Sequence, residues 1–234
     1  VVVCNTPDAP SISTAEHTMS LLMAASKFTA NNVARLRAGR QDFYAAHEGI
    51  ELSGATIGVV GHGRIGSRVA RMCAAMDMRV IVCDPYVEVV EHEQVDLDVI
   101  LTESRIITMH TPLTDETRNL LDAAAFARMQ DGVIIVNAAR GGVIDTQALV
   151  DALDSGKVYA AGLDVTAPEP LDPEHTLLNR DNVVVTPHIA SATDKGRVRM
   201  YSGAIENARQ VLAGERPVDC VNPHVYEVLE GRSS

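Results

Sequence analysis

Basic side chains are scarce in this chain, and their scarcity limits its partners. The 234 residues include 20 Lys and Arg against 31 Asp and Glu, which gives a formal net charge of −11. Nucleic-acid binding needs a basic face that neutralises phosphates, so this balance argues against a nucleic-acid partner. An anionic ligand must instead be held by local features of the protein.

Long apolar runs and closely spaced cysteines are also absent. The most apolar early stretch, residues 19–25, is far too short to span a bilayer, so we expect no membrane partner. The four cysteines form no CxxC motif, and we predict no metal site. We expect Cys4, Cys73, Cys83 and Cys220 to be reduced and buried, as suits a cytoplasmic protein.

The start of the chain has an unusual composition. Position 1 is Val rather than Met, and residues 1–4 form an apolar run typical of a buried strand. A lone strand cannot bury both of its faces. We therefore expect that N-terminal material is missing, and that the chain is the cofactor domain of a longer protein.

The rest of the chain has the rhythm of alternating strands and helices. Ser13 and Glu16 have the spacing of a capping box, and a helical apolar pattern follows to about Arg37. Further helices are expected at residues 65–76, 146–153 and 192–212. Apolar strands are expected at residues 56–60, 79–83, 105–109, 133–137, 158–163 and 183–186. This order predicts an α/β fold: a Rossmann-type, doubly wound parallel sheet with helices on both faces.

A glycine-rich loop follows the first of these strands. Residues 61–66 read Gly-His-Gly-Arg-Ile-Gly and open a helix, which is the context of a dinucleotide-binding loop. Gly61 allows a tight turn, Gly63 lets backbone approach a pyrophosphate, and Gly66 allows close helix packing. Asp84 ends the next strand, where a carboxylate binds the ribose and repels a 2′-phosphate, so NAD is favoured over NADP. The alternative is a glycine turn in a flavin or nucleotide-sugar protein.

Arg140, Glu169 and His188 follow three later strands. Taken singly, Arg140 fits a surface residue pairing with Asp145, Glu169 a solvated residue and His188 a packed one. The carboxyl ends of parallel strands share one edge, however, and ligands bind there. A cation for a substrate carboxylate, an imidazole for proton transfer and a carboxylate that keeps it charged predict hydride transfer to a 2-keto acid. The other histidines, such as His17, are interpreted mostly as surface or packing residues.

The combination of motifs resembles the D-isomer-specific 2-hydroxyacid dehydrogenases, which include phosphoglycerate dehydrogenases and glyoxylate/hydroxypyruvate reductases. The resemblance rests on the glycine loop, His-Thr-Pro-Leu-Thr at 110–114, Asn-Ala-Ala-Arg-Gly-Gly at 137–142, Gly-Leu-Asp-Val at 162–165 and Thr-Pro-His-Ile-Ala-Ser at 186–191. It implies an NAD-dependent oxidoreductase acting on a small 2-hydroxy or 2-keto acid.

The resemblance also assigns residues to roles. It implies that Arg140 binds the substrate carboxylate, that Glu169 pairs with His188 as the catalytic acid and base, and that Asp164 contacts the nicotinamide carboxamide. The cofactor contacts that it implies are Gly61, Gly63, Arg64, Ile65, Gly66, Asp84, Thr111, Pro112, Ala138, Ala139, Arg140, Asp164, His188 and Ala190.

The substrate stays open within the glyoxylate, hydroxypyruvate and 3-phosphoglycerate class. Many family members have an aromatic residue where this chain has Thr166, and here the chain resembles the glyoxylate/hydroxypyruvate reductases. Asp84-Pro85-Tyr86 instead resembles the NAD-dependent phosphoglycerate branch. A second alternative is a corepressor of the C-terminal-binding-protein type, which keeps the same three residues and uses NAD to control assembly.

The resemblance finally divides the chain into four parts. It implies a remnant of the substrate domain at residues 1–13, an interdomain and dimer-forming helix at 14–39, the NAD-binding domain at 40–190, and a helix returning to the substrate domain, with a tail, at 191–234. It thereby implies a homodimer. Because most of the substrate domain is missing, we expect poor turnover from these residues alone.

Overall fold

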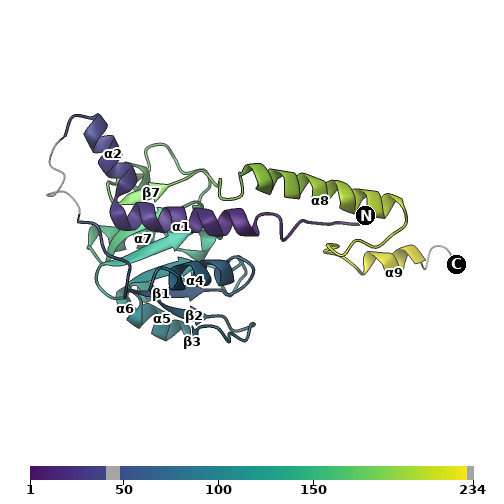
Figure 1. Cartoon of the computed structure of the whole chain (residues 1–234), viewed down its shortest axis with the longest axis horizontal. Helices are drawn as coiled ribbons and strands as arrows, with labels where there is room; N and C mark the ends of the chain where they lie inside the picture. The colour runs from purple at the N-terminus through teal and green to yellow at the C-terminus, as the bar shows by residue number, and fades with distance from the viewer. Residues whose placement is uncertain (41–47, 231–234) are drawn as a thin grey trace. The chain divides into compact units, whose positions relative to one another are not determined.

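The chain folds into two compact units. The computed structural model describes residues 1–40 and 48–230 (Figure 1). One unit is Thr14–Ala190, and the other combines Val1–Ser13 with the chain from Ser191 onward. No helix in these described ranges is long and apolar enough to cross a membrane.

The larger unit is built on a parallel sheet. Its strands in the described part of the chain are β1 (Thr56–Val60), β2 (Arg79–Cys83), β3 (Glu93–Gln94), β4 (Ile106–Met109), β5 (Val133–Asn137), β6 (Val158–Leu163) and β7 (Val183–Val185). Their spatial order is β3-β2-β1-β4-β5-β6-β7. This confirms the predicted α/β class and, to within a residue at each end, the six apolar strands. Strand β3 was not predicted, because its two exposed polar residues carry no apolar signal.

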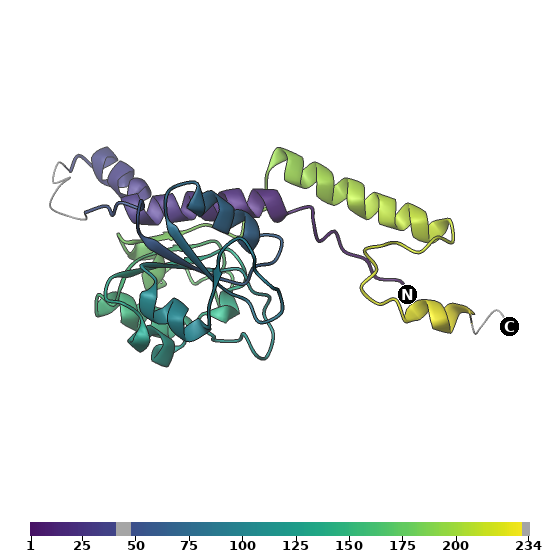
Figure 2. The same ribbon diagram turned by 60° about the horizontal axis from the view of Figure 1, so that its bottom comes forward.

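Helices cover both faces of the sheet. The first is α1 (Ser11–Lys27), and the others in this unit are α2 (Thr29–Arg37), α4 (Gly66–Ala74), α5 (Leu97–Glu103), α6 (Ala123–Arg128) and α7 (Thr146–Asp154). On one face α1 and α4 pack against Ile106 and Ile134, and on the other α5, α6 and α7 pack against Ile107 and Ile135 (Figure 2). Neighbouring strand residues thus face opposite layers, which explains why the strands are apolar throughout.

Strand register places the loops after five strands at one edge of the sheet. Val60 at the end of β1 lies opposite Cys83 of β2 and Met109 of β4. On the other side, Asn137 at the end of β5 lies opposite Leu163 of β6. The loops that follow these strands therefore all begin at the carboxyl edge, where the predicted functional residues lie.

The predicted long N-terminal helix is divided into two. Phe28 has a left-handed φ of 52° between α1 and α2, and its ring is buried and packs edge-on against Tyr159 at a centroid distance of 5.4 Å. Burial of this ring interrupts the helix. The predicted capping box is wrong as well, because α1 already begins at Ser11. The Ser13 hydroxyl instead lies 2.7 Å from the Thr193 hydroxyl.

The smaller unit contains α8 (Asp194–Leu212) and α9 (Val225–Glu230). The predicted strand at residues 1–4 is wrong, because only Cys4 forms a bridge, antiparallel to Cys220. Val1 and Val3 are exposed, so the apolar run does not enter a core. The expectation of four buried cysteines also fails: Cys73 is buried and the other three are half-buried.

Candidate active site

The glycine loop between β1 and α4 has the close contacts that its glycines predict. Gly61 has a φ of 93°, and a Cβ there would lie 2.8 Å from the His110 carbonyl. A Cβ on Gly66 would lie 2.0 Å from the Gly61 oxygen, which explains the tight packing of helix on strand. A Cβ on Gly63 would meet nothing within 4 Å. Gly61 and Gly66 are therefore packed against the protein, whereas Gly63 faces open space, where the backbone can approach a ligand.

The start of α4 suits an anion. Ile65 is the N-cap, and among the described residues no side chain caps the helix there. Arg64 and Gly63 are exposed beside it. The positive end of the helix dipole favours negative charge at this position.

Asp84 lies beside this loop, after β2. One carboxylate oxygen accepts the His62 N–H at 2.7 Å, and the other accepts the N–H of Tyr86 at 2.9 Å and of Val87 at 3.2 Å. These bonds fix the carboxylate in the wall of a cavity of 720 Å³. The cavity is lined by Gly61, Gly63, Asp84, Thr111 and Pro112, together with the segment from Asp115 to Thr117.

Two polar side chains after β4 complete this cavity. The buried Thr111 hydroxyl has no hydrogen-bond partner in the described ranges, so it can serve a ligand. Burial lowers the pKa of His110 to about 3, and its Nε2 lies 2.9 Å from the Thr108 hydroxyl. His110 is therefore neutral near pH 7. The cavity fits an adenosine diphosphate group, because it offers open space at Gly63, an acidic lining residue in Asp84 and the unsatisfied Thr111 hydroxyl.

The loop after β5 presents Arg140. Asn137 shapes this loop, because its Oδ1 accepts the Ala139 N–H at 2.9 Å and its Nδ2 donates to the Arg140 carbonyl at 3.0 Å. Arg140 is exposed, and its Nη1 donates to the Ala139 carbonyl at 2.7 Å. The alternative pairing with Asp145 is not seen, because Asp145 caps α7 through the Ala148 N–H. Ala138 is buried beneath the loop.

Glycine at position 141 ties this loop to the loop after β6. A Cβ there would lie 1.9 Å from the Thr166 carbonyl oxygen, so only glycine allows the approach. The Thr166 N–H in turn donates to Glu169 Oε2 at 3.3 Å. The Arg140 and Glu169 loops are therefore packed against each other at the sheet edge.

Glu169 and His188 form the pair that the sequence predicts. Glu169 Oε1 lies 2.5 Å from His188 Nδ1, and both side chains remain about half exposed. His188 has a left-handed φ of 53°, and its N–H is shared between the carbonyls of Asp164 at 2.8 Å and Thr186 at 3.0 Å. The backbone thus aims the imidazole, and the carboxylate leaves its Nε2 facing away from Glu169. A cavity of 310 Å³ is lined by Asp164, Thr166, Glu169 and His188.

Asp164 holds the loop that carries His188. Its carboxylate is fully buried and accepts hydrogen bonds from the Thr186 hydroxyl at 2.6 Å and from the N–H groups of Ile189 and Ala190, both at 2.9 Å. These bonds fix both sides of His188. The contact between Asp164 and a nicotinamide carboxamide stays a prediction.

His17 joins this network from α1 and was missed by the sequence analysis. Its Nε2 lies 3.0 Å from the Thr186 hydroxyl and 3.3 Å from Asp164 Oδ1. Nothing in the sequence distinguishes it from a packing histidine, because 147 positions separate it from Asp164. No cluster of three or more His, Cys, Asp or Glu side chains suitable for a metal ion occurs in the described part of the chain.

Comparisons with known proteins identify similar sequences and structures. The sequence model described as D-isomer specific 2-hydroxyacid dehydrogenase, NAD binding domain, matches residues 19–190. A D-3-phosphoglycerate dehydrogenase of Archaeoglobus fulgidus is 44% identical over 205 residues, covering 86% of this chain and 39% of that protein. A hydroxypyruvate reductase of Thermotoga maritima is 44% identical over 210 residues, covering 88% of this chain and 68% of that protein.

A solved structure is also similar to this chain. A D-isomer specific 2-hydroxyacid dehydrogenase from Lactobacillus delbrueckii, in its NAD-complexed form, matches with a TM-score of 0.84 and 30% identity. The match covers 95% of this chain and 72% of that one. Against the Archaeoglobus fulgidus protein, however, the chain spans well under half of the relative's length.

Proposed function

Because the chain belongs to the D-isomer-specific 2-hydroxyacid dehydrogenase family, we propose that it carries the NAD-binding part of an oxidoreductase that interconverts small 2-hydroxy and 2-keto acids. The observation that carries this proposal is the 2.5 Å contact between Glu169 and His188. That pair lies at the same sheet edge as an open glycine loop with Asp84 beside it. NAD is the cofactor of the matched domain.

The protein's own residues would hold the cofactor at three places. The backbone of the glycine loop, with Arg64 and Ile65, would bind the pyrophosphate. Asp84 would accept hydrogen bonds from the adenosine ribose and would exclude a 2′-phosphate by charge repulsion. Thr111 and Pro112 would line the adenosine side, and Ala138, Ala139, Asp164 and Ala190 the nicotinamide side. When bound, NADH supplies the hydride that reduces a keto carbon.

The three predicted catalytic residues would divide the remaining work. The exposed guanidinium of Arg140 would bind the substrate carboxylate through paired N–H donors. His188, as imidazolium, would donate a proton from Nε2 to the substrate oxygen, and would remove it in the reverse direction. Glu169 would orient the ring through Nδ1 and stabilise its positive charge.

Two readings of the substrate remain within the same class, which comprises glyoxylate, hydroxypyruvate and 3-phosphoglycerate. The relatives named above support both branches, because one is a phosphoglycerate dehydrogenase and the other a hydroxypyruvate reductase. All the relatives named above are dehydrogenases or reductases, so the comparisons give no support to the corepressor alternative.

The test is a substitution at His188 in the purified natural protein. His188→Ala should lower turnover of all three acids by on the order of 10²-fold or more, because proton transfer is lost. NADH affinity, measured by fluorescence titration, should change little. His224→Ala, at another exposed histidine, is the matched control. Unchanged turnover in His188→Ala would reject the proposal.

Assembly and domain roles belong to the same proposal. We assign residues 14–39 to a dimer-forming arm, because Met23, Val33 and Leu36 leave apolar surface exposed along α1 and α2. We assign residues 1–13 and 191–234 to the substrate domain. Exposed apolar residues on α8, such as Val198 and Ile205, suit packing against more of that domain. Free thiols suit a cytoplasmic setting.

A further inference from the structure

Two cysteines from opposite ends of the chain face each other in the smaller unit. The Val3 carbonyl accepts the Val221 N–H at 2.9 Å, and the Asn5 N–H donates to the Asp219 carbonyl at 3.2 Å. Cys4 and Cys220 lie between these two hydrogen bonds as directly opposed, antiparallel residues. Nothing local in the sequence links positions 4 and 220, so this pairing is visible only in the folded chain.

The hydrogen-bond pattern defines the geometry of the pair. The neighbours of Cys4 and Cys220 exchange the bonds, whereas the two cysteines do not, so they form a non-hydrogen-bonded pair. In such pairs the Cα atoms lie about 4.5 Å apart and the side chains project to the same side. Disulfides accept Cα separations from about 4.4 to 6.8 Å, so the pair falls within the permitted range.

The surroundings of the pair hold both segments in register. Asn222 accepts the Val3 N–H at 2.8 Å through Oδ1 and donates to the Val1 carbonyl at 2.9 Å through Nδ2. From α8, Asn207 donates to the Asn5 carbonyl at 2.9 Å. These contacts, on both sides of Cys4, limit the freedom of the segment and keep the thiols opposed.

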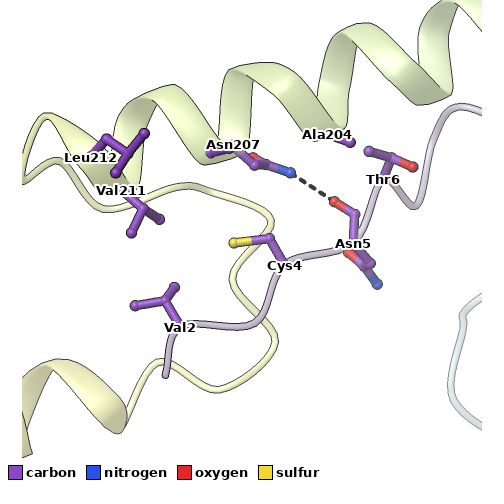
Figure 3. Close-up of a pocket in the computed structure, with 9 residues that line it drawn as sticks. Val2, Cys4, Asn5, Thr6, Ala204, Asn207, Val211 and Leu212 are labelled. Atoms are coloured by element: carbon purple, nitrogen blue, oxygen red, sulfur yellow. Dashed lines mark hydrogen bonds between the residues drawn. The ribbon is translucent and has the colours of Figure 1, made fainter.

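Cys4 is also accessible to small molecules. Cys4 lines a cavity of 520 Å³ with Val2, Thr6 and the α8 residues Asn207 and Val211 (Figure 3). Both cysteines are half-buried rather than enclosed. The remaining cysteines lie in the other unit, where burial raises the pKa of Cys73 to about 12. Burial and the neighbouring Cys220 raise the pKa of the Cys4 thiol as well, so the pair is distinguished by the direct opposition of its two cysteines and not by a favoured thiolate.

We propose that Cys4 and Cys220 are a redox modification site that closes to an intramolecular disulfide in the presence of an oxidised small-molecule disulfide such as oxidised glutathione. One thiolate attacks the glutathione disulfide, which forms a mixed disulfide and releases one reduced glutathione. The second thiolate then attacks the protein sulfur of the mixed disulfide and releases a second reduced glutathione. Two protein thiols are oxidised and one glutathione disulfide is reduced.

The bond would join the two stretches of the smaller unit covalently. Residues 1–13 and the chain from 191 onward are otherwise connected in sequence only through the whole of Thr14–Ala190. A cross-link between positions so far apart removes many unfolded conformations, so the oxidised protein should melt at a higher temperature, by roughly 5 °C. This inference does not depend on the dehydrogenase assignment.

The experiment counts thiols before and after oxidation. The full chain is incubated with oxidised glutathione, denatured, alkylated with N-ethylmaleimide and analysed by intact mass and peptide mapping. We expect two of the four cysteines to escape alkylation and a peptide containing Cys4 to be linked to one containing Cys220. Cys83→Ser, the matched control at a half-buried cysteine, should still form the link, and Cys4→Ser should not.

Three outcomes would overturn the proposal. Four alkylated thiols would show that the pair does not close. Stable glutathione adducts on both cysteines would show that the second attack fails. A link between other cysteines, or between two chains on a non-reducing gel, would show that the β-bridge does not direct the chemistry. Because wild-type protein gives the deciding result, a poorly folding variant would not obscure it.

Discussion

At the scale of single residues, the orientation of His188 depends on a carboxylate that is fully buried. Asp164 accepts the N–H groups of Ile189 and Ala190 directly after the histidine and the Thr186 hydroxyl before it. His17 contacts both Asp164 and Thr186. A change in α1 can therefore move the imidazole without touching it.

Substitution of His17 tests this positioning role. His17→Ala should lower kcat by on the order of 10- to 100-fold, because small displacements of a catalytic group are costly. The affinity of the variant for NADH should stay close to that of the wild type, because the glycine loop is not altered. His17→Gln, which keeps a donor near the Thr186 hydroxyl, should recover most of the activity. Steady-state kinetics on 2-keto acids would measure this, and an equal loss of kcat in both variants would contradict it.

His110 makes stability depend on pH. Burial lowers the pKa of His110 from 6.5 to about 3. Between these two pH values the imidazole is protonated in the unfolded chain and neutral in the folded chain. This contribution is complete above pH 6.5 and is lost as the pH falls toward 3. Urea unfolding should show that the free energy of unfolding is lower at pH 4.5 than at pH 7 by on the order of 2 kcal/mol. His110→Asn should flatten that dependence, whereas the exposed control His224→Asn should leave it unchanged. An unaltered slope in His110→Asn would be inconsistent with this account.

At the scale of elements, two glycines of the turn from β1 to α4 have different roles. Gly66 is needed for stability, and Gly63 for ligand binding. Gly66→Ala should destabilise the protein by about 3 kcal/mol, because its Cβ would collide with the Gly61 carbonyl. Gly63→Ala has open space and should leave the unfolding midpoint unchanged. Its methyl group should nevertheless weaken NADH binding at least tenfold, since it occupies the path of the pyrophosphate. Equal Kd values for Gly63→Ala and wild type would show that the ligand lies elsewhere.

The elements that sequence analysis found are those with strong local signals. Strands such as β4 and β5 are buried throughout, so unbroken apolar runs identified them. Phe28 escaped prediction, because its left-handed conformation depends on burial against Tyr159, far along the chain. The Glu169–His188 pair followed from motif order, whereas the contact of His17 with Asp164 arises only from tertiary packing.

At the scale of the whole molecule, exposed apolar side chains on α2 predict self-association. Leu36 is 60% exposed, and Leu36→Glu should shift a homodimer toward monomer, because a buried unpaired carboxylate is costly. Light scattering at micromolar concentration would give the mass. Leu178→Glu, at a comparably exposed leucine in the 3-10 turn Thr176–Asn179, should not alter it. A wild-type protein of monomer mass would contradict the assignment.

The edge strand β3 has a consequence for behaviour in concentrated solution. It contains only Glu93 and Gln94, and Arg79 bridges from β2 to Glu93 and Glu103, both at 2.8 Å. Gln94 also turns its amide onto the Asp84 and Val87 carbonyls. A strand of two polar residues has few unpaired backbone groups with which a strand of another chain could form hydrogen bonds. On this side the sheet should therefore resist growth into aggregates, even when newly made chains are crowded together.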